Sequence, residues 1–516
     1  MEFNLFLWAI ASLPIFLLLF LMSYMKIKSR NAAFFSLIIT SIFASIIYQL
    51  NINQLIISTG KGASLSLYVI LIILGAVLLY SIVDIAGGFE TIKNFIKELG
   101  GNRALLFIGL SWAFSGFIQG VTGFGVPVAI AGALIIGIGY KPLPSVIAVL
   151  VGHSWSVSFG SIGSSYYTIQ LVTGLDPYRL GIIMSLLFIV TIFSTGIFTA
   201  HIYGGWKVVK ENIKDILLMT VLMSLAKVGA AIGGFAHIAT LLAGTIGSIY
   251  FMIILIKNSK LNLKEAFFYE TNQMTILTAL APYLILIGSI LTFQLSPLSN
   301  FLPDYNLSFS FPGFTTGLGH QVASEPAYAT IELFNHPVFY LLLSSSLGII
   351  IYIFKGNLNK IKLKNIFAVT YKKGHSTAIT LLILMIMSTI MNDSGMIFNF
   401  ARGMARVSGN VFPLFSPLIG ILGAFLTGSN TSSNVLFGAF QVNTANLINF
   451  SPDIIASTQS IGGSLGSAIA PAKILLGTSV VGITGKEGEI IKSCIKYTIF
   501  NALLVGLVAL LAGQFL

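Results

Sequence analysis

Long, uninterrupted apolar segments are the feature that most constrains this chain. A helix needs about 20 apolar residues to cross a bilayer, and segments near that length recur throughout the sequence. Inside lipid the backbone must be paired within the segment, so such a run is helical. We therefore predict an all-α polytopic membrane protein with about 11–14 transmembrane helices. The clearest predicted spans are 5–25, 32–50, 65–85, 180–203, 216–232, 238–256, 276–295, 338–354, 378–391 and 495–511.

The few charges of the chain support this topology. Only 9% of the 516 residues are charged and the net charge is +12, whereas soluble domains carry about 25% charged residues. Residues 296–337 hold acids but no Lys or Arg, which places them outside. By the positive-inside rule the basic loops are cytoplasmic and the N-terminus is outside. The basic loops are 26–30, 93–103, 207–214, 257–264 and 355–373.

Composition also limits the partners of the protein. The basic excess of a membrane protein lies in its cytoplasmic loops, so it does not indicate nucleic-acid binding. A single cysteine, Cys494, excludes an intrachain disulfide and a cysteine metal cluster. Residues 1–25 lack a basic leader and a cleavage site, so we predict a retained first helix rather than a signal peptide. The lipid bilayer of the plasma membrane is the expected surrounding, and a homodimer is left open.

A polar run interrupts the apolar sequence near the C-terminus. Residues 426–434 read Leu-Thr-Gly-Ser-Asn-Thr-Ser-Ser-Asn, with apolar residues on both sides. Gly428 can release a helix, and the hydroxyl and amide side chains can bond to the freed backbone. A break at membrane depth is tolerated only where it faces protein or water, and broken helices form the substrate sites of secondary transporters. This run therefore predicts a transporter with its binding site here.

An earlier stretch of the chain resembles this region. Phe-Ile-Gln-Gly at 117–120 matches Phe-Leu-Thr-Gly at 425–428, and a proline and a glycine ten residues apart follow in both, with a Ser/Gly break after each. Paired interruptions in two halves are typical of transporter sites. The alternative is that the glycines only let helices pack closely. We predict two repeated units containing re-entrant or broken helices, within four parts: scaffold helices at 1–103, a first core at 104–203, scaffold helices with an outer loop at 204–409, and a second core at 410–516.

Three motifs resemble one family of transporters. They are FIQGVTGFGVPVAIAGALIIG at 117–137 followed by GYKPL at 139–143, FPLFSPLIGILGAFLTGSNTSSNVLFGAFQ at 412–441, and QSIGGSLGSAIAPAKILLGTSVVGITGKEG at 459–488. These sequences are similar to the lactate permease family, and the resemblance implies uptake of lactate or glycolate with protons. The triplet at 429–431 also resembles a signature of sodium-coupled carboxylate transporters, which implies inverted repeats and an elevator-like motion.

Two positions depart from the family pattern. The family often has Glu where this chain has Gln119, and an amide does not carry a proton. Some members have Asn-Thr/Ser-Ala-Pro where this chain has His-Ser-Trp-Ser at 153–156. Both departures put the identity of the coupling ion in question. Proton coupling remains the leading interpretation, and sodium coupling is the alternative.

A small 2-hydroxy acid needs partners for its carboxylate and its hydroxyl. Helix N-termini supply amides and a favourable dipole for an anion, and the breaks near Gly123 and Gly428 can provide them. Lys473 lies in an apolar run, where a cation costs about 2.5–3.5 kcal/mol, so it is a candidate for balancing the substrate charge. The alternatives are that the hydroxyls cap their own helix and that Lys473 snorkels to an interface. The candidate substrate-binding residues are Ser429, Asn430, Thr431, Ser433, Asn434, Gly123, Gly125, Gln119, Ser156 and Lys473.

Two titratable residues are the candidates for proton coupling. Asp393 ends an apolar span beside Asn392, and its alternative role is a solvated helix cap. His153 lies in the second break of the first unit, and an imidazole changes charge near neutral pH; its alternative role is structural. Lys227 lies in another apolar run, where snorkelling is favoured. No cofactor and no metal site are expected, because no metal-spaced cluster occurs.

Four functions remain open at this point. The leading hypothesis is a proton-coupled monocarboxylate symporter, and the second is a sodium-coupled carboxylate transporter. An anion channel lined by the breaks is a third. A membrane enzyme is the least favoured, because the acidic residues are scattered along the chain.

Overall fold

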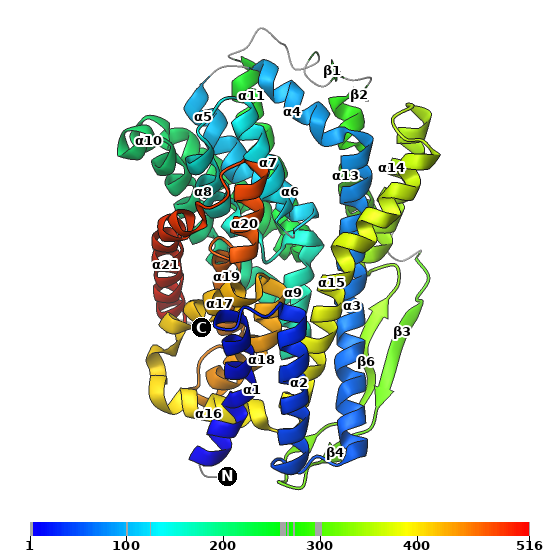
Figure 1. The fold of residues 1–516 in the computed structure, drawn as a ribbon, viewed down its shortest axis with the longest axis vertical. Helices are drawn as coiled ribbons and strands as arrows, with labels where there is room; N and C mark the ends of the chain where they lie inside the picture. Colours follow the sequence, from blue (N-terminus) through cyan, green and yellow to red (C-terminus); the bar gives the residue numbers. More distant parts are fainter. Residues whose placement is uncertain are drawn as a thin grey trace.

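The computed structural model describes residues 4–99, 102–123, 125–257, 265, 268–271, 274–294 and 302–514. Among these residues, eleven helices are long and apolar enough to cross a membrane, or twelve if one bent pair counts as a span. The predicted all-α multi-pass architecture, with about 11–14 spans, is therefore confirmed. Figure 1 shows an elongated bundle in which the helices run mostly along the long axis.

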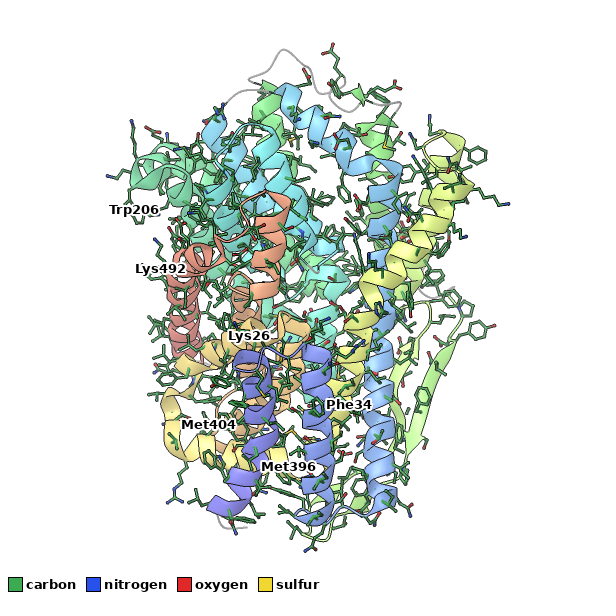
Figure 2. All side chains as sticks on the ribbon, in the orientation of Figure 1. Lys26, Phe34, Trp206, Met396, Met404 and Lys492 are labelled. Carbon is green, nitrogen blue, oxygen red and sulfur yellow. The ribbon has the colours of Figure 1, made fainter. Side chains whose placement is uncertain are left out.

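A first group of helices surrounds two long ones that lie side by side, α3 and α15. The N-terminal pair α1 and α2 covers only the lower half of this group in Figure 1, and Lys26 at their junction lies near mid-height in Figure 2. Since the pair is short, the upper faces of α3 and α15 are left uncovered on that side. The group contains α1 (Leu5–Ser23), α2 (Ser29–Ile46), α3 (Ile52–Ala86), α4 (Gly88–Leu99), α13 (Ile276–Gln294), α14 (Pro337–Phe354), α15 (Lys360–Asp393) and α16 (Met396–Ser408).

Helix α3 is longer than its apolar pattern predicted. It begins at Ile52 rather than near residue 65, because Asn51 and Gln54 form a capping box at its N-terminus. Some polar residues of its N-terminal half, among them Ser58 and Lys61, are buried against α15 rather than exposed. The predicted span 65–85 covered only the apolar half of α3, because the polar half depends on tertiary packing rather than on contact with lipid.

A second group holds both interrupted regions. Its members pack on one another through α8, α9, α10 and α19, which lie at its centre. The group contains α5 (Arg103–Ile108), η1 (Gly109–Phe114), α6 (Ser115–Val121), α7 (Val126–Gly137), α8 (Pro142–Gly152), η2 (His153–Ser156), α9 (Gly160–Thr173), α10 (Pro177–Ile232), η3 (Ala236–Ile238), α11 (Ala239–Lys257), η5 (Gly409–Val411), α17 (Phe412–Thr427), α18 (Asn430–Leu447), α19 (Pro452–Gly466), α20 (Pro471–Val480) and α21 (Glu487–Ala512).

The helices of this group break where the sequence predicted interruptions. Helices α17 and α18 meet at Gly428, whose φ of +74° is accessible to glycine at little cost. Helices α8 and α9 are bent by 52° around η2. The glycines also allow close packing: a Cβ on Gly462 would lie 2.0 Å from the carbonyl oxygen of Pro417. The two interrupted regions are present, while their origin as a repeat and the four-part division of the chain stay predictions.

Three regions differ from the expected loops. In the expected basic loop 355–373, residues 360–373 form the first part of α15. Residues 207–214 were expected in a cytoplasmic loop, but they continue α10, which leaves helical geometry only at Gly204 and Gly205. The outer segment 296–337 was expected to be a loop, and its described part contains antiparallel strands along α3 (Figure 1). These strands are β3 (Asn306–Phe311) with β6 (Glu325–Glu332), and β4 (Phe314–Thr315) with β5 (Gln321–Val322). A further pair, β1 (Glu270–Thr271) with β2 (Met274–Thr275), lies before α13.

Candidate functional site

A small polar cavity lies where the interrupted helices meet. It has a volume of about 340 Å³, counted with the part open to solvent, and it brings together segments more than 300 residues apart in sequence. Its walls come from α6, the break between η2 and α9, the tip of the α17–α18 hairpin and the start of α20. The lining residues are Gln119, Gly123, Val157, Ser161, Ser164, Ser165, Gly428, Ser429, Asn430, Thr431 and Lys473.

The α17–α18 tip presents a helix N-terminus to this cavity. Gly428 ends α17, and Ser429 caps α18 by accepting a hydrogen bond from the N–H of Ser432 at 3.3 Å. The N–H groups of the first turn, those of Asn430 and Thr431, have no preceding turn to accept them. The positive end of the helix dipole therefore points towards the cavity, which suits an anion.

Lys473 is the cation of this site. It is the third residue of α20, after Pro471, and its side chain is only 7% exposed. No carboxylate forms an ion pair with it in the part of the chain that the structure describes. A buried and uncompensated ammonium beside a helix N-terminus makes the cavity strongly attractive to a small anion.

Gln119 adds an amide with an unpaired oxygen to the lining of the cavity. It lies within α6 rather than in the break after it, and only 2% of the residue is exposed. Its Oε1 atom is buried without a hydrogen-bond partner, although buried polar atoms are nearly always paired. An unpaired amide at a cavity wall can serve both as donor and as acceptor for a bound polar molecule.

The serines of the first break form the opposite wall. Ser161, Ser164 and Ser165 line the cavity, and the hydroxyl of Ser165 lies 2.8 Å from that of Thr431. These three were missed from the sequence, which indicated Ser156 instead. The hydroxyl of Ser156 donates to the carbonyl of His153 and does not line the cavity. The positive φ of Ser161 and Ile162 reorients the chain after η2, and spacing alone does not reveal that change.

Two of the predicted polar residues of α18, Ser433 and Asn434, form hydrogen bonds within the protein and do not line the cavity. Ser433 donates to the carbonyl of Gly420 at 2.9 Å, and Asn434 donates to the carbonyl of Ser165 at 2.9 Å and to Ser460 at 3.0 Å. Asn430 does both: it lines the cavity, and its amide donates to Ser158 at 3.1 Å. This network ties the α17–α18 tip to the first break, so the two regions hold one another in place.

The remaining predicted residues lie near the cavity or far from it. Gly125 caps α7 and packs against α20, since a Cβ there would lie 2.8 Å from Leu476. His153 is fully buried at the start of η2, and its Nδ1 lies 2.6 Å from the carbonyl of Val149. Asp393 lies at the end of α15, where it pairs with Lys61 at 3.6 Å and accepts from Ser58 at 2.9 Å. Neither proton-coupling candidate lines the cavity, and their roles stay predictions.

A wider vestibule continues from the small cavity. Its volume is about 1360 Å³, counted with the part open to solvent, and it shares Gly428, Ser429 and Lys473 with the inner cavity. It extends between α3 and α15 to Ser29 and Lys373, beside basic segments at the α1–α2 junction and in α15. The positive-inside rule places basic segments on the cytoplasmic side, so the vestibule opens towards the side that the sequence predicts to be cytoplasmic.

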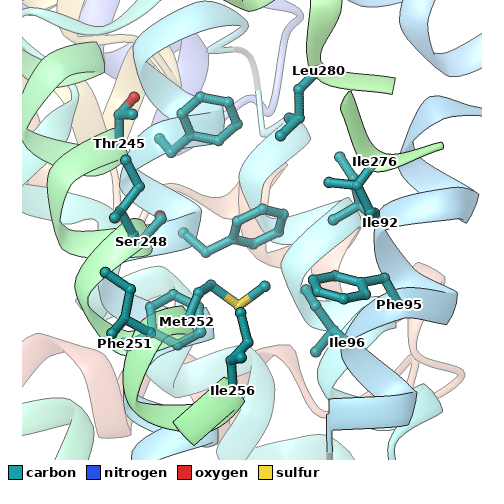
Figure 3. Close-up of a pocket in the computed structure, with 14 residues that line it drawn as sticks. Ile92, Phe95, Ile96, Thr245, Ser248, Phe251, Met252, Ile256, Ile276 and Leu280 are labelled. Atoms are coloured by element: carbon teal, nitrogen blue, oxygen red, sulfur yellow. The ribbon is translucent and has the colours of Figure 1, made fainter. Parts of the chain in front are cut away.

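A third cavity is apolar and does not resemble the site. It lies between α4 and α13 on one side and α11 on the other, with Phe95 and Met252 among the residues that face it (Figure 3). No charged residue lines it. An anion would lose its hydration there without gaining a partner, so this cavity is not a candidate for carboxylate binding.

The comparison with known proteins decides the family. The L-lactate permease family model matches residues 8–516. The chain belongs to the L-lactate permease family. It is 26% identical to glycolate permease GlcA of Escherichia coli, over 97% of this chain and 95% of the relative. It is 28% identical to an L-lactate permease of Streptococcus iniae over 88% and 94%, and 27% identical to that of Escherichia coli over 98% and 96%.

The family membership confirms the resemblance drawn from the three motifs. The chain is a multi-pass membrane transporter by this membership and by its spans. Its fold is similar to that of MtrF of Neisseria gonorrhoeae, described as an antimetabolite efflux pump, with a TM-score of 0.51. That likeness covers 95% of this chain and 96% of the other at 14% identity, so it concerns the fold alone.

Proposed function

We propose that this transporter takes up lactate- and glycolate-type 2-hydroxy monocarboxylates by proton symport. The observation that carries the proposal is the ammonium of Lys473 beside the N-terminus of α18 in a polar cavity. The relatives named L-lactate permease and glycolate permease support the substrate class.

The cavity offers each group of such a substrate a partner. The carboxylate binds between the Lys473 ammonium and the first-turn N–H groups of Asn430 and Thr431. The 2-hydroxyl then lies towards the opposite wall, where Gln119 and Ser161 offer amide and hydroxyl groups. A charge-assisted hydrogen bond is roughly twice as strong as a neutral one, so Lys473 contributes most to affinity.

Proton coupling and an elevator-like motion complete the proposal. Titratable side chains buried beside the breaks, His153 and Lys473, support coupling to protons. The apolar cavity between α4, α13 and α11 supports a motion in which one group slides along the other, since no hydrogen bonds need to break there. The cytoplasmic vestibule represents the inward-open end of that motion.

Transport by purified protein in proteoliposomes tests this function. We expect counterflow of labelled lactate, competed by glycolate, and accumulation driven by an acidic exterior that a protonophore abolishes. Asn430→Ala and Lys473→Met are expected to reduce counterflow in folded protein. Accumulation that follows sodium and ignores the protonophore would support sodium coupling instead. Passive flux without accumulation would identify an anion channel.

A further inference from the structure

A fully buried lysine lies behind the first break, on the side away from the cavity. Lys227, in the second half of α10, has an exposed fraction of 0%. Its Nζ donates to the carbonyl of Trp155 at 3.1 Å and to the hydroxyl of Thr240 at 3.4 Å. In the described part of the chain no carboxylate pairs with it. The sequence favoured snorkelling for this residue, but the side chain points into the protein.

Aromatic rings enclose the ammonium of Lys227. It lies 3.8 Å from the ring centroid of Phe188, 4.7 Å from that of Trp155 and 5.2 Å from that of Phe159. Cation–π attraction is stronger for a desolvated ammonium than for an exposed one. The site is thus shaped for a cation, and its negative partners are ring faces and one backbone carbonyl.

The carbonyl that Lys227 binds belongs to the broken helix. Trp155 lies in η2, where α8 has ended, and the carbonyls of a helix C-terminus carry partial negative charge and lack helical partners. In transporters with broken helices, such carbonyls coordinate the coupling ion. In this chain the ammonium of Lys227, on α10, donates a hydrogen bond to one such carbonyl, that of Trp155.

The same short segment connects Lys227 to the substrate cavity. Trp155 and Phe159 face the ammonium, while Val157 and Ser161, on the same segment, line the cavity. The N–H of Val157 also donates to Ser464 at 3.0 Å, which ties the segment to α19. A change in the charge of Lys227 therefore acts directly on the backbone that shapes one wall of the site.

Other titratable groups do not compensate this charge. The elements around this part of α10 carry His153 on η2, His237 on η3, Tyr166 and Tyr167 on α9, Tyr250 on α11 and Asp453 on α19. Among the described contacts, neither these nor the charged residues of α5 and α21 bond to Lys227. Asp453 instead pairs with Arg179 at 2.9 Å.

We propose that Lys227 carries the coupled proton, as a tethered cation at the first break; this rests on the proposed proton symport. The protonated amine bonds to Trp155 and holds the break in the form that binds the anion. When the aromatic wall opens, one N–H bond of the ammonium breaks, the proton passes to water and a neutral amine remains. Because the ammonium is sealed from water in this structure, proton exchange requires the break to move, which links it to transport.

Substitutions of Lys227 in proteoliposomes separate exchange from accumulation. For one proton per lactate, the wild type is expected to accumulate lactate about tenfold per unit of pH gradient. Lys227→Met removes the positive charge, and Lys227→Arg keeps a positive charge because a guanidinium does not release its proton. Both are expected to lose accumulation above the external concentration. Lys227→Arg keeps the positive charge that holds the break, so it should retain lactate counterflow, whereas Lys227→Met should weaken counterflow. Lys210→Met, exposed on the same helix, controls for the loss of one positive charge.

Each outcome decides the proposal. Accumulation like that of the wild type in either variant would overturn it. Loss of counterflow together with accumulation in both variants would overturn it as well, because Lys227 would then be structural. If Lys227→Met alone does not fold, Lys227→Arg decides by the same two measurements. A wild type that accumulates lactate only with sodium would overturn the proton symport itself, and this outcome is distinguishable because it needs no variant.

Discussion

At the scale of single residues, the site depends on charges that the fold buries. The ammonium of Lys473 attracts an anion strongly because it is shielded from water and has no carboxylate partner among the described residues. The Lys61–Asp393 pair is buried to a similar degree, with side-chain exposures of 7% and 3%, yet its charges neutralise each other. Lys473 is therefore available to bind an anion, whereas Lys61 stabilises the fold through Asp393, and a distinct prediction follows for each.

Lys473→Met is expected to weaken substrate binding without unfolding the protein. A hydrogen bond to a charged group contributes about 1.5–3 kcal/mol, which corresponds to roughly 10- to 100-fold in affinity. The concentration of lactate that half-saturates counterflow measures this change. Lys473→Arg retains the charge and should lie between the variant and the wild type. Half-saturation at the wild-type concentration in Lys473→Met would contradict the assignment.

Asp393→Asn is expected to destabilise the protein strongly. Removing one partner of a buried ion pair leaves an uncompensated charge, at a cost of about 3–5 kcal/mol. Adding Lys61→Met should recover most of that loss, because the charge left behind is then also removed. Thermal unfolding in detergent of the two single variants and the double variant forms the cycle. If the double variant is folded and still accumulates lactate with a pH gradient, Asp393 is not the proton carrier.

At the scale of elements, the α17–α18 hairpin depends on one backbone conformation. Gly428 has φ of +74°, and a Cβ there would meet only Ala472 at 3.7 Å, an ordinary contact. Substitution therefore adds backbone strain rather than a collision. The strain acts where α17 ends, immediately before the residues that present their N–H groups to the cavity.

Gly428→Ala should lower both stability and substrate affinity. A non-glycine residue in the left-handed region costs roughly 1–2 kcal/mol, and relief of that strain moves the tip away from Lys473. Gly482→Ala is the matched control, since its φ is +73° and a Cβ would contact nothing within 4 Å. We expect similar losses of thermal stability in both variants, with weaker lactate counterflow only in Gly428→Ala. Equal affinities in the two variants would show that the tip does not position the substrate.

At the scale of the whole molecule, two groups of helices meet along faces of different character. Near the vestibule the facing surfaces carry hydroxyl and lysine side chains among apolar ones, and between α4, α13 and α11 they are apolar. An apolar contact surface has few directional bonds, so it allows sliding at low cost. The fold shared with MtrF spans both groups.

A cross-link across the apolar cavity is expected to stop transport. Ile92 on α4 and Ser248 on α11 line opposite sides of it (Figure 3). Cysteines at both positions, joined by a bifunctional maleimide, should abolish lactate counterflow, and each single cysteine treated in the same way should not. The native Cys494 is fully buried and should remain unmodified. Full counterflow in the cross-linked double variant would rule out relative motion of these helices.

Much of the architecture was predictable from the sequence, for a physical reason. Lipid excludes unpaired backbone, so an apolar run of sufficient length is a helix whatever surrounds it. The break at Gly428 and the unusual Lys473 were predictable for the same reason, since both are exceptions inside apolar sequence. The lengths of α3 and α15 were not, because the polar half of each helix packs on the apolar part of the other, with Gly62 near Ile386 and Gly374 near Leu74.

The sequence by itself determined that this chain is a helical membrane transporter, where its helices break, and which motifs mark its family. Only the tertiary structure decided which polar residues meet. It placed Ser161 and Lys473 on one cavity, turned Ser433 and Asn434 into the protein, paired Asp393 with Lys61, and enclosed Lys227 in aromatic rings. Composition along the chain reports the preference of each segment for lipid. The direction of a side chain depends on backbone angles at a break and on neighbours that are distant in sequence.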